Sequence, residues 1–256
     1  MTSRLPLSVF IIAVNEGDRI GRTIASVRDW ADEVIVIDSG SNDDTVAVSQ
    51  AAGARALYNP WPGYGRQKRF GEEQCRNDWL LNLDADEVIS QELAQEIQAL
   101  FAQGVPKQAG YWMDIVEILP GRRRPDWRSH RVRAIRLYDR RSGRFDESTV
   151  HDSVRMSPGA GIVTLAGIIE HRSSRGIAHT IDKINRYSTM QAADMLKRGL
   201  PSLLALRIVF ELPVGFFKAY MLRGYFLHGF YGFINAVNYG YSRFARLAKA
   251  WEGKQR

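Results

Sequence analysis

The chain has 256 residues, enough for one full-sized hydrophobic core with an appendage. Hydrophobic residues make up 45% and charged residues 25%, as in ordinary globular proteins, and the single cysteine, Cys75, excludes an intramolecular disulfide. The net charge of +7 favours an anionic partner, and it leaves open nucleic acid, anionic lipid and a phosphorylated small molecule.

The N-terminal half predicts strands and helices in alternation. Continuous apolar runs, typical of strands buried on both faces, stand at 7–14, 33–39 and 78–85. The first run reads as a strand and not as a signal peptide, because no small-residue cleavage site follows it. A short strand is expected near 54–58, and helices are expected around 20–27 and at 43–54, 67–76 and 90–103. This alternation predicts parallel strands with right-handed crossovers, which bind ligands at their carboxyl ends.

Acidic residues close the strand at 78–85. Residues i and i+2 of a strand point the same way, so the carboxylates of Asp84 and Asp86 can face one ligand. Mg²⁺ and Mn²⁺ prefer oxygen ligands and often combine one or two carboxylates with substrate phosphates. The pattern therefore favours a divalent metal site, with a solvated loop or a helix N-terminus as the alternative.

The stretch after the second strand, Asp38-Ser39-Gly40-Ser41, suits a nucleoside. Asp38 can accept a hydrogen bond from a ribose hydroxyl or a uracil N–H, and Gly40 allows close approach of the backbone. The alternative is a simple connection from strand to helix. Because Asn15 and Glu16 follow the first strand, three polar clusters are expected at one edge of the sheet.

The second half changes character. Residues 110–172 read as strands without long helices between them, which predicts mixed pairing, and a helix is expected from His179 to about Arg198. The tail from Pro201 holds 13 of the 27 aromatic residues and eight Lys or Arg against two Glu. We therefore expect a catalytic domain at 1–200 and a helical extension at 201–256, lying at a membrane interface or packed as a cap.

Three motifs, "FIIAVNE" (10–16), "VIDSGSNDDT" (36–45) and "LLNLDADE" (80–87), resemble in order and spacing the inverting glycosyltransferases of family 2. The stretches at 63–71, 150–154, 165–171 and 182–188 resemble the branch that adds a β-glucose to heptose in the lipopolysaccharide inner core. The resemblance covers nearly the whole chain. It implies an α/β fold of the GT-A type, a Rossmann-like mixed sheet flanked by helices, with a C-terminal helical extension.

The resemblance also implies roles for individual residues. Nucleotide-sugar binding is expected of Asn15, Glu16, Asp38, Gly40, Asp84 and Lys68. Asp86 and His171 would hold Mg²⁺ or Mn²⁺, and Asp152 would be the catalytic base. Lys183 and Arg186 are candidates for contact with the acceptor or the diphosphate, with an ordinary helix surface as the alternative. His228 stands where the family typically has an aspartate, which leaves the role of that motif open.

The expected function is that of a metal-dependent inverting hexosyltransferase. It would move glucose from a UDP-sugar to a lipid-linked saccharide, as a peripheral protein on the anionic cytoplasmic face of the bacterial inner membrane. Another acceptor, such as a polyprenyl phosphate, another polysaccharide or a peptide, remains an alternative. A nucleotidyltransferase would share the fold and the metal but release pyrophosphate. A nucleic-acid partner is not expected, because it would not explain acidic residues at three strand ends.

Overall fold

The computed structural model divides into two compact units, Met1–Ser173 and Ser174–Arg256. The residues that it describes are 4–119, 122, 124–125, 129–147, 153–200 and 202–255. The division falls earlier than the expected boundary at residue 200, because helix α5 (Ile177–Arg198) packs along α7 (Gly229–Gln255). Each unit is therefore considered by itself.

The first unit is built on an eight-stranded sheet in the order β3-β2-β1-β4-β7-β6-β10-β5. The bounds of these strands are β1 Leu5–Ala13, β2 Ala31–Asp38, β3 Arg55–Tyr58, β4 Trp79–Asp84, β5 Glu87–Ile89, β6 Gly110–Glu117, β7 Arg131–Asp139 and β10 Ile162–His171. The first four strands run parallel, whereas β7 is antiparallel to both of its neighbours and β10 is antiparallel to β5. The predicted α/β class with a mixed sheet is confirmed.

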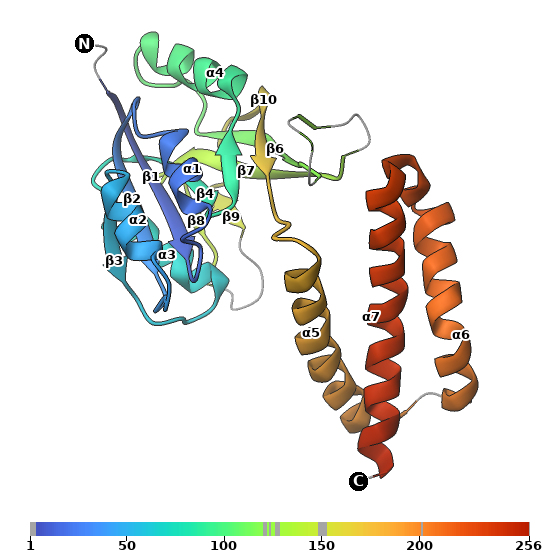
Figure 1. The fold of residues 1–256 in the computed structure, drawn as a ribbon. Helices are drawn as coiled ribbons and strands as arrows, with labels where there is room; N and C mark the ends of the chain where they lie inside the picture. The colour runs from blue at the N-terminus through green and yellow to red at the C-terminus, as the bar shows by residue number, and fades with distance from the viewer. Residues whose placement is uncertain are drawn as a thin grey trace. The chain divides into compact units, whose positions relative to one another are not determined.

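Both faces of the sheet are covered, as the continuous apolar runs predicted. Val9 and Ile11 of β1 face a core shared with α1 (Ile20–Ala25) and α4 (Gln91–Ala102), while Phe10 between them faces a second core. That second core includes Phe145 of β8 (Gly143–Phe145) and lies beside α3 (Tyr64–Gln74). Helix α2 (Thr45–Ala51) packs on the first face, and Figure 1 shows these helices around the central strands.

The predicted elements of the N-terminal half are present, with bounds within a few residues. Ser90 is the N-cap of α4, as expected, and its hydroxyl accepts from the backbone N–H of Leu93 at 3.2 Å. The sequence reading missed β5, β8 and β9 (Val154–Met156). Each of these strands has only three residues, too few to show an alternating pattern.

The second unit contains α5, α6 (Leu204–Phe217) and α7, with a π-helical turn at Lys218–Leu222 and a 3₁₀ turn at Tyr225–His228. Helices α6 and α7 lie side by side, as Figure 1 shows, and their backbones approach closely at two glycines. A Cβ atom on Gly240 would lie 2.6 Å from the carbonyl oxygen of Leu212, and one on Gly215 would lie 2.9 Å from the Cα of Gly240. The backbones therefore meet where neither residue carries a side chain.

Helix α6 also has an apolar face that is exposed within its unit. We call it the α6 outer face, and its large side chains recur every three or four residues: Leu203, Leu206, Phe210, Val214 and Phe217. Glu211 is the one acidic residue between 195 and 251, and it pairs with Arg243 of α7. In the described part of the chain, no helix combines the length and the hydropathy that a membrane crossing needs.

Candidate active site

The register of the sheet brings three strand ends together. Ala13 of β1 lies opposite Asp38 of β2, and Ile12 lies opposite Asp84 of β4. A cleft of about 590 Å³ opens at this edge, within the size range of small-molecule sites. Its polar lining comes from Glu16, Asp84, Asp86 and His171 among others. The predicted convergence of polar clusters on one edge of the sheet is therefore observed.

Asp84 lies between two cations. The buried ammonium of Lys68 contacts one carboxylate oxygen at 2.9 Å, and the guanidinium of Arg136 donates to the other at 3.1 Å. Burial alone would raise the pKa of Asp84, but the charges of Lys68 and Arg136 outweigh it and hold that pKa well below the usual range. Asp84 is thus an ionised, fixed carboxylate whose side chain remains 36% exposed toward the cleft.

Arg136 connects Asp84 to two further buried side chains. Its guanidinium donates to Asn82 at 2.6 Å and to Glu87 at 2.7 Å, in addition to Asp84. The second oxygen of Glu87 accepts from the backbone N–H of Asp84 at 2.9 Å. Burial raises the pKa of Glu87, and the positive charge of Arg136 opposes that shift. We refer to Lys68, Asp84, Glu87 and Arg136 as the buried charge cluster.

Asp86 faces His171 across the cleft wall. The Nε2 atom of His171 lies 3.1 Å from Oδ2 of Asp86, because β10 ends beside β5 and pairs His171 with Glu87. The hydrogen bond with Asp86 raises the pKa of His171. Burial works against ionisation of Asp86, yet His171 and Arg19 keep the pKa of Asp86 below its usual value.

The donors of Asp86 and His171 fit a divalent ion. One carboxylate oxygen and one imidazole nitrogen lie within hydrogen-bond distance of each other on the cleft wall, so both can turn to one cation. Two protein ligands suit a metal whose remaining positions are filled by diphosphate oxygens and water. Among the described residues no group of three or more His, Cys, Asp or Glu is gathered as a closed cage.

Arg19 connects the loop after β1 with Asp86 and with the end of β10. Its guanidinium pairs with Glu16, lies 3.4 Å from Asp86, and donates at 3.3 Å to the backbone carbonyls of Arg172 and Ser173. The loop after β1 is thereby held against the end of β10. Arg19 could not be singled out from the sequence, since the carbonyls of Arg172 and Ser173 that it contacts lie more than 150 residues away in the chain.

The turn after β2 is built around Asp38. Its carboxylate accepts from the backbone N–H groups of Gly40 and Ser41, each at 2.9 Å, and from the Ser41 hydroxyl. Gly40 has a φ of 99°, a conformation that favours glycine. Asp38 and Gly40 therefore shape the loop beside the cleft, whether or not they also touch a nucleoside.

Asn15 holds the neighbouring loop in place. Its backbone N–H donates to the Ser41 hydroxyl at 2.8 Å, and its side-chain oxygen accepts from the N–H of Asn42 at 2.8 Å. The residue has a φ of 56°, in the left-handed region that asparagine tolerates better than most residues. The ends of β1 and β2 are thus bound to each other directly.

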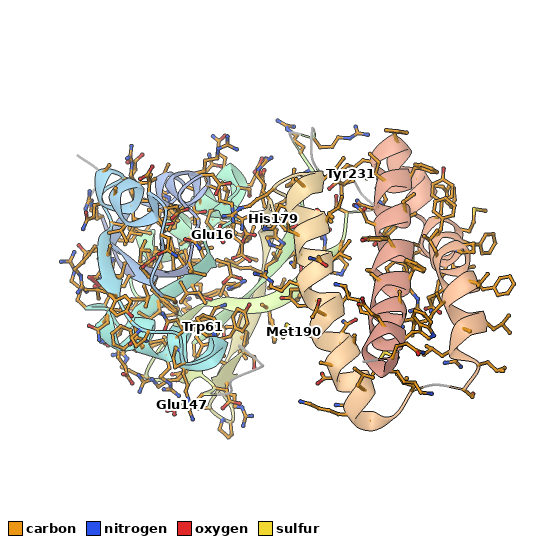
Figure 2. The ribbon with its side chains drawn as sticks, turned by 60° about the horizontal axis from the view of Figure 1, so that its bottom comes forward. Glu16, Trp61, Glu147, His179, Met190 and Tyr231 are labelled. Carbon is orange, nitrogen blue, oxygen red and sulfur yellow. The ribbon has the colours of Figure 1, made fainter. Side chains whose placement is uncertain are left out.

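Two aromatic residues add an apolar wall. Trp61, from the connection between β3 and α3, and Tyr64, the first residue of α3, pack edge to face with ring centroids 4.8 Å apart. Both line the cleft and are about half exposed, and Figure 2 labels Trp61 and Glu16 on this unit. Exposed aromatic faces can stack on a planar base. The signal available in the sequence was an aromatic pair flanked by Pro60, Pro62 and Gly63.

The described structure does not place the remaining predicted residues relative to this cleft. Asp152 lies outside the described residues, and its role stays a prediction. Lys183 and Arg186 lie on α5 in the second unit, each near the ring of Tyr187, so their contact with a diphosphate also stays a prediction. His228 ends the 3₁₀ turn of the same unit.

The chain is similar to known proteins over nearly its whole length. A sequence model described as "Glycosyl transferase family 2" matches residues 8–159. The chain is 39% identical over 251 residues to "Uncharacterized glycosyltransferase RP128" of Rickettsia prowazekii, over 95% of this chain and 86% of that protein. It is 32% identical over 258 residues to "Lipopolysaccharide core biosynthesis glycosyltransferase LpsC" of Rhizobium meliloti, over 98% and 94% respectively. The crystal structure of residues 1–349 of S. aureus TarS aligns with a TM-score of 0.47 at 14% identity, over 97% and 91% of the two chains.

Proposed function

Because this chain belongs to glycosyltransferase family 2, we propose that it transfers glucose from UDP-glucose to a hydroxyl of the lipopolysaccharide inner core, with inversion at the anomeric carbon. The observation that carries the proposal is the cleft in which Asp84, Asp86 and His171 meet at the carboxyl ends of the sheet. The printed name of the Rhizobium relative, which spans nearly the whole chain, supports a saccharide of the lipopolysaccharide core as the acceptor.

The donor occupies the cleft with its base toward the loops after β1 and β2. Asn15 and Asp38 hold these loops in one conformation, and Trp61 and Tyr64 offer aromatic faces to the base. Asp84 accepts from a hydroxyl of the ribose or the sugar, since the cations beside it keep it ionised and fixed. Such preorganisation lowers the entropic cost of orienting the substrate.

Asp86 and His171 would hold Mg²⁺ or Mn²⁺ near the diphosphate. When bound, the ion would supply positive charge to stabilise the leaving nucleoside diphosphate. The pairing of Asp86 with His171 keeps the carboxylate ionised and oriented toward the cleft wall. Lys183 and Arg186 are proposed as further contacts to the diphosphate or the acceptor.

Asp152 is the proposed general base. Its carboxylate takes the proton of the acceptor hydroxyl while the hydroxyl oxygen attacks the anomeric carbon. The bond between that carbon and the phosphate oxygen breaks on the opposite face, which inverts the configuration. General base catalysis of this kind contributes roughly 10²–10⁴-fold to the rate.

A donor screen tests the proposal. UDP-, GDP- and ADP-glucose are each incubated with the full chain and a lipopolysaccharide core acceptor, with Mn²⁺ and with excess EDTA. We expect transfer from UDP-glucose but not from the other two donors, and only in the presence of Mn²⁺ without EDTA. Asp86→Asn should lose metal-dependent donor binding, while Asp29→Asn, at a carboxylate 82% exposed, serves as the matched control.

Two outcomes would change the assignment. Full activity in excess EDTA would remove the metal, and with it the role of His171. Release of pyrophosphate from UTP in the presence of a sugar phosphate would instead favour a nucleotidyltransferase.

The variant Asp152→Asn tests the proposed base. It should keep the donor affinity and lose turnover, because the Asp152 carboxylate acts only on the acceptor proton.

We further propose that the protein works as a peripheral protein on the cytoplasmic face of the inner membrane. The α6 outer face exposes large apolar side chains, and the surrounding tail carries an excess of basic residues. A second copy of the chain would present the same positive charge to itself, whereas an anionic lipid surface complements it. The α6 outer face is accordingly proposed to enter the headgroup region.

A further inference from the structure

A second cavity, of about 300 Å³, lies in the first unit beside α3 and the β8–β9 hairpin. It shares no lining residue with the cleft among those described. Its charged lining consists of Asp146 and five arginines, namely Arg69, Arg140, Arg141, Arg144 and Arg155. We call it the arginine pocket. Guanidinium groups gathered around one cavity repel one another, and the carboxylates beside them offset that repulsion to different degrees.

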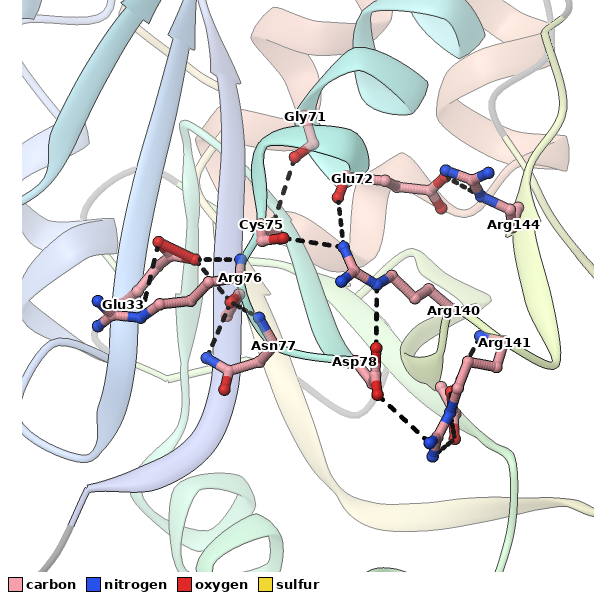
Figure 3. Close-up of polar contacts among 12 residues, drawn as sticks. Glu33, Gly71, Glu72, Cys75, Arg76, Asn77, Asp78, Arg140, Arg141 and Arg144 are labelled. Carbon is pink, nitrogen blue, oxygen red and sulfur yellow. Dashed lines mark hydrogen bonds and ion pairs between the residues drawn. The ribbon is translucent and has the colours of Figure 1, made fainter.

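Two of these arginines serve the fold. Arg140 donates at 2.8 Å to the carbonyl of Cys75 and at 3.3 Å to Asp78, which joins the end of β7 to the start of β4 (Figure 3). Arg141 pairs with Asp139 at 2.6 Å and with Asp78 at 3.3 Å. These contacts leave the two side chains fixed at the rim of the pocket.

Arg69 and Arg144 are less completely satisfied. Both point to the carboxylate of Glu72, at 3.6 and 3.5 Å, and Arg144 also lies 3.6 Å from the carboxylate of Glu73. All three distances are longer than a hydrogen bond. The other oxygen of Glu72 already accepts from the Tyr138 hydroxyl at 2.5 Å and from the backbone N–H of Phe145 at 2.9 Å. Within the described part of the chain, the buried Nε of Arg69 has no hydrogen-bond partner. Two guanidinium groups therefore retain donors for a further acceptor.

Glu72 is buried behind these arginines. Burial raises the pKa of Glu72, against the hydrogen bond from Tyr138 and the nearby arginines. Arg155, on the opposite strand of the hairpin, pairs with Asp146 at 2.6 Å and is 76% exposed. Of the charged side chains that line the pocket, five are thus arginines and one is an aspartate.

We propose that the arginine pocket binds a phosphate or carboxylate group carried by the saccharide acceptor. Arginine forks match the paired oxygens of such groups and form charge-assisted hydrogen bonds with them. The proposal rests on the proposed function in one respect, the choice of the acceptor over a free anion. In the chain, Asp152 lies between β8 and β9, the two strands that carry Arg144 and Arg155. Phe145 also lines the pocket, and its ring centroid lies 5.3 Å from the Nζ of Lys68, which contacts Asp84 in the cleft. A saccharide held at the pocket can therefore extend toward the donor in the cleft.

Binding of simple probes tests the pocket without any transfer reaction. Glucose 6-phosphate, glucuronate, inorganic phosphate and neutral glucose are titrated into the full chain, and binding is followed by NMR or calorimetry. The three anions should bind and glucose should not. The double variant Arg69→Gln/Arg144→Gln should bind the anions about tenfold more weakly or worse, since each guanidinium contributes a charge-assisted contact.

One control variant and one substitute variant isolate the effect. Arg66→Gln removes an exposed arginine of the same helix that does not line the pocket, and it should bind the anions like the wild type. If the double variant fails to fold by circular dichroism, Arg144→Lys replaces it, because that change keeps the charge but loses the fork. Anion binding that is equal in wild type and variant would overturn the proposal.

UDP binding separates the two hypotheses. UDP should bind all these variants as tightly as it binds the wild type. If the wild type itself does not bind UDP, that result counts against the proposed donor and not against the pocket. In the transfer assay, inorganic phosphate should compete with the acceptor. Inhibition that is not relieved by excess acceptor would identify a free-anion effector site and overturn the assignment to the acceptor.

Discussion

At the scale of single residues, the buried charge cluster explains how Asp84 can stand ionised at the end of a buried strand. The carboxylates of Asp84 and Glu87 are matched by the ammonium of Lys68 and the guanidinium of Arg136. Such a cluster is stable only while it is complete, because each member compensates the desolvation of the others. The cluster therefore fixes the geometry of the cleft and makes it sensitive to substitution.

Replacing Arg136 by leucine tests this dependence. The change would leave Glu87 and Asp84 facing each other in the interior, and loss of one partner of a buried pair typically costs about 3–5 kcal/mol. Urea unfolding followed by circular dichroism measures the loss. Arg133→Leu, which removes a 54% exposed arginine of the same strand, should shift the midpoint far less. Equal shifts in the two variants would contradict the cluster.

Cys75 provides a second test at this scale. The thiol is 5% exposed and donates to the carbonyl of Gly71 at 3.2 Å, and burial raises its pKa to about 12. Because the thiolate is the reactive form, the native protein should react with a disulfide reagent at pH 8 at least about a hundredfold more slowly than protein in urea. Rapid reaction of the native protein would show that this interior opens readily.

The residues of the cleft were only partly visible in the sequence. Acidic residues at the ends of apolar runs predicted where Asp84, Asp86 and Glu16 would meet, because parallel strands share one edge. Arg136 was hidden, since it is one of five arginines within residues 131–141 and its partners come from other strands. Which side chains pair across a sheet depends on register, and one sequence does not state the register.

At the scale of elements, the crossing of α6 and α7 depends on Gly215 and Gly240. Backbone atoms, which cannot rotate away, surround the position where a Cβ of Gly240 would stand. Pro213 within α6 removes one helical hydrogen bond donor nearby, so this helix relies on packing more than on its own ladder. The contact between the two backbones is therefore the element-scale feature most open to test.

Gly240→Ala should destabilise the helical unit although alanine has the higher helix propensity. The added methyl would lie 2.6 Å from the carbonyl oxygen of Leu212 and 3.0 Å from the N of Phe216, so the helices must separate. Gly253→Ala on the same helix is the control, because its methyl would meet only the flexible end of Leu196. Thermal unfolding should show a lower midpoint for the first variant and an unchanged or higher one for the second. The reverse order would refute the close crossing.

Long elements were predicted well and short ones were not. The strands β1, β2 and β4 and the capped helix α4 carry their own signals, namely continuous apolar runs and Ser90. The strands β5, β8 and β9 exist because neighbours offer them hydrogen bonds, a tertiary effect. The grouping of α5 with the C-terminal helices is likewise a matter of packing along α7.

At the scale of the whole molecule, the proposed chemistry and the proposed membrane attachment belong to different units. The cleft and the arginine pocket belong to the first unit, and the α6 outer face belongs to the second. The positive charge of the tail was evident from composition alone. That the apolar residues of α6 would gather on one exposed face required the structure, because the same periodicity also describes a helix packed as a cap.

Flotation with lipid vesicles tests the proposed attachment. The full chain should float with vesicles containing anionic lipid at low salt and less so at high salt, since basic residues near such a surface contribute about 1 kcal/mol each. Phe210→Glu with Phe217→Glu on the α6 outer face should reduce flotation severalfold. Val105→Glu, at a 73% exposed apolar residue of the first unit, should not. Equal flotation of both variants would move the contact away from α6.

The left-handed conformation of Asn15 has a consequence for how this protein can vary. A side chain with a Cβ pays roughly 1–2 kcal/mol at such a φ, and asparagine offsets part of this through its bond to Asn42. Most replacements at this position should therefore lower the stability of the fold by a similar amount, whatever their effect on the chemistry. A saturation library ranked first by thermal stability should place asparagine, glycine and aspartate highest. Measuring UDP binding of the most stable variants would then separate a backbone requirement from a ligand contact. Asn15→Gly is the informative variant, because it should fold, and its UDP binding then shows whether the Asn15 side chain contacts the nucleotide.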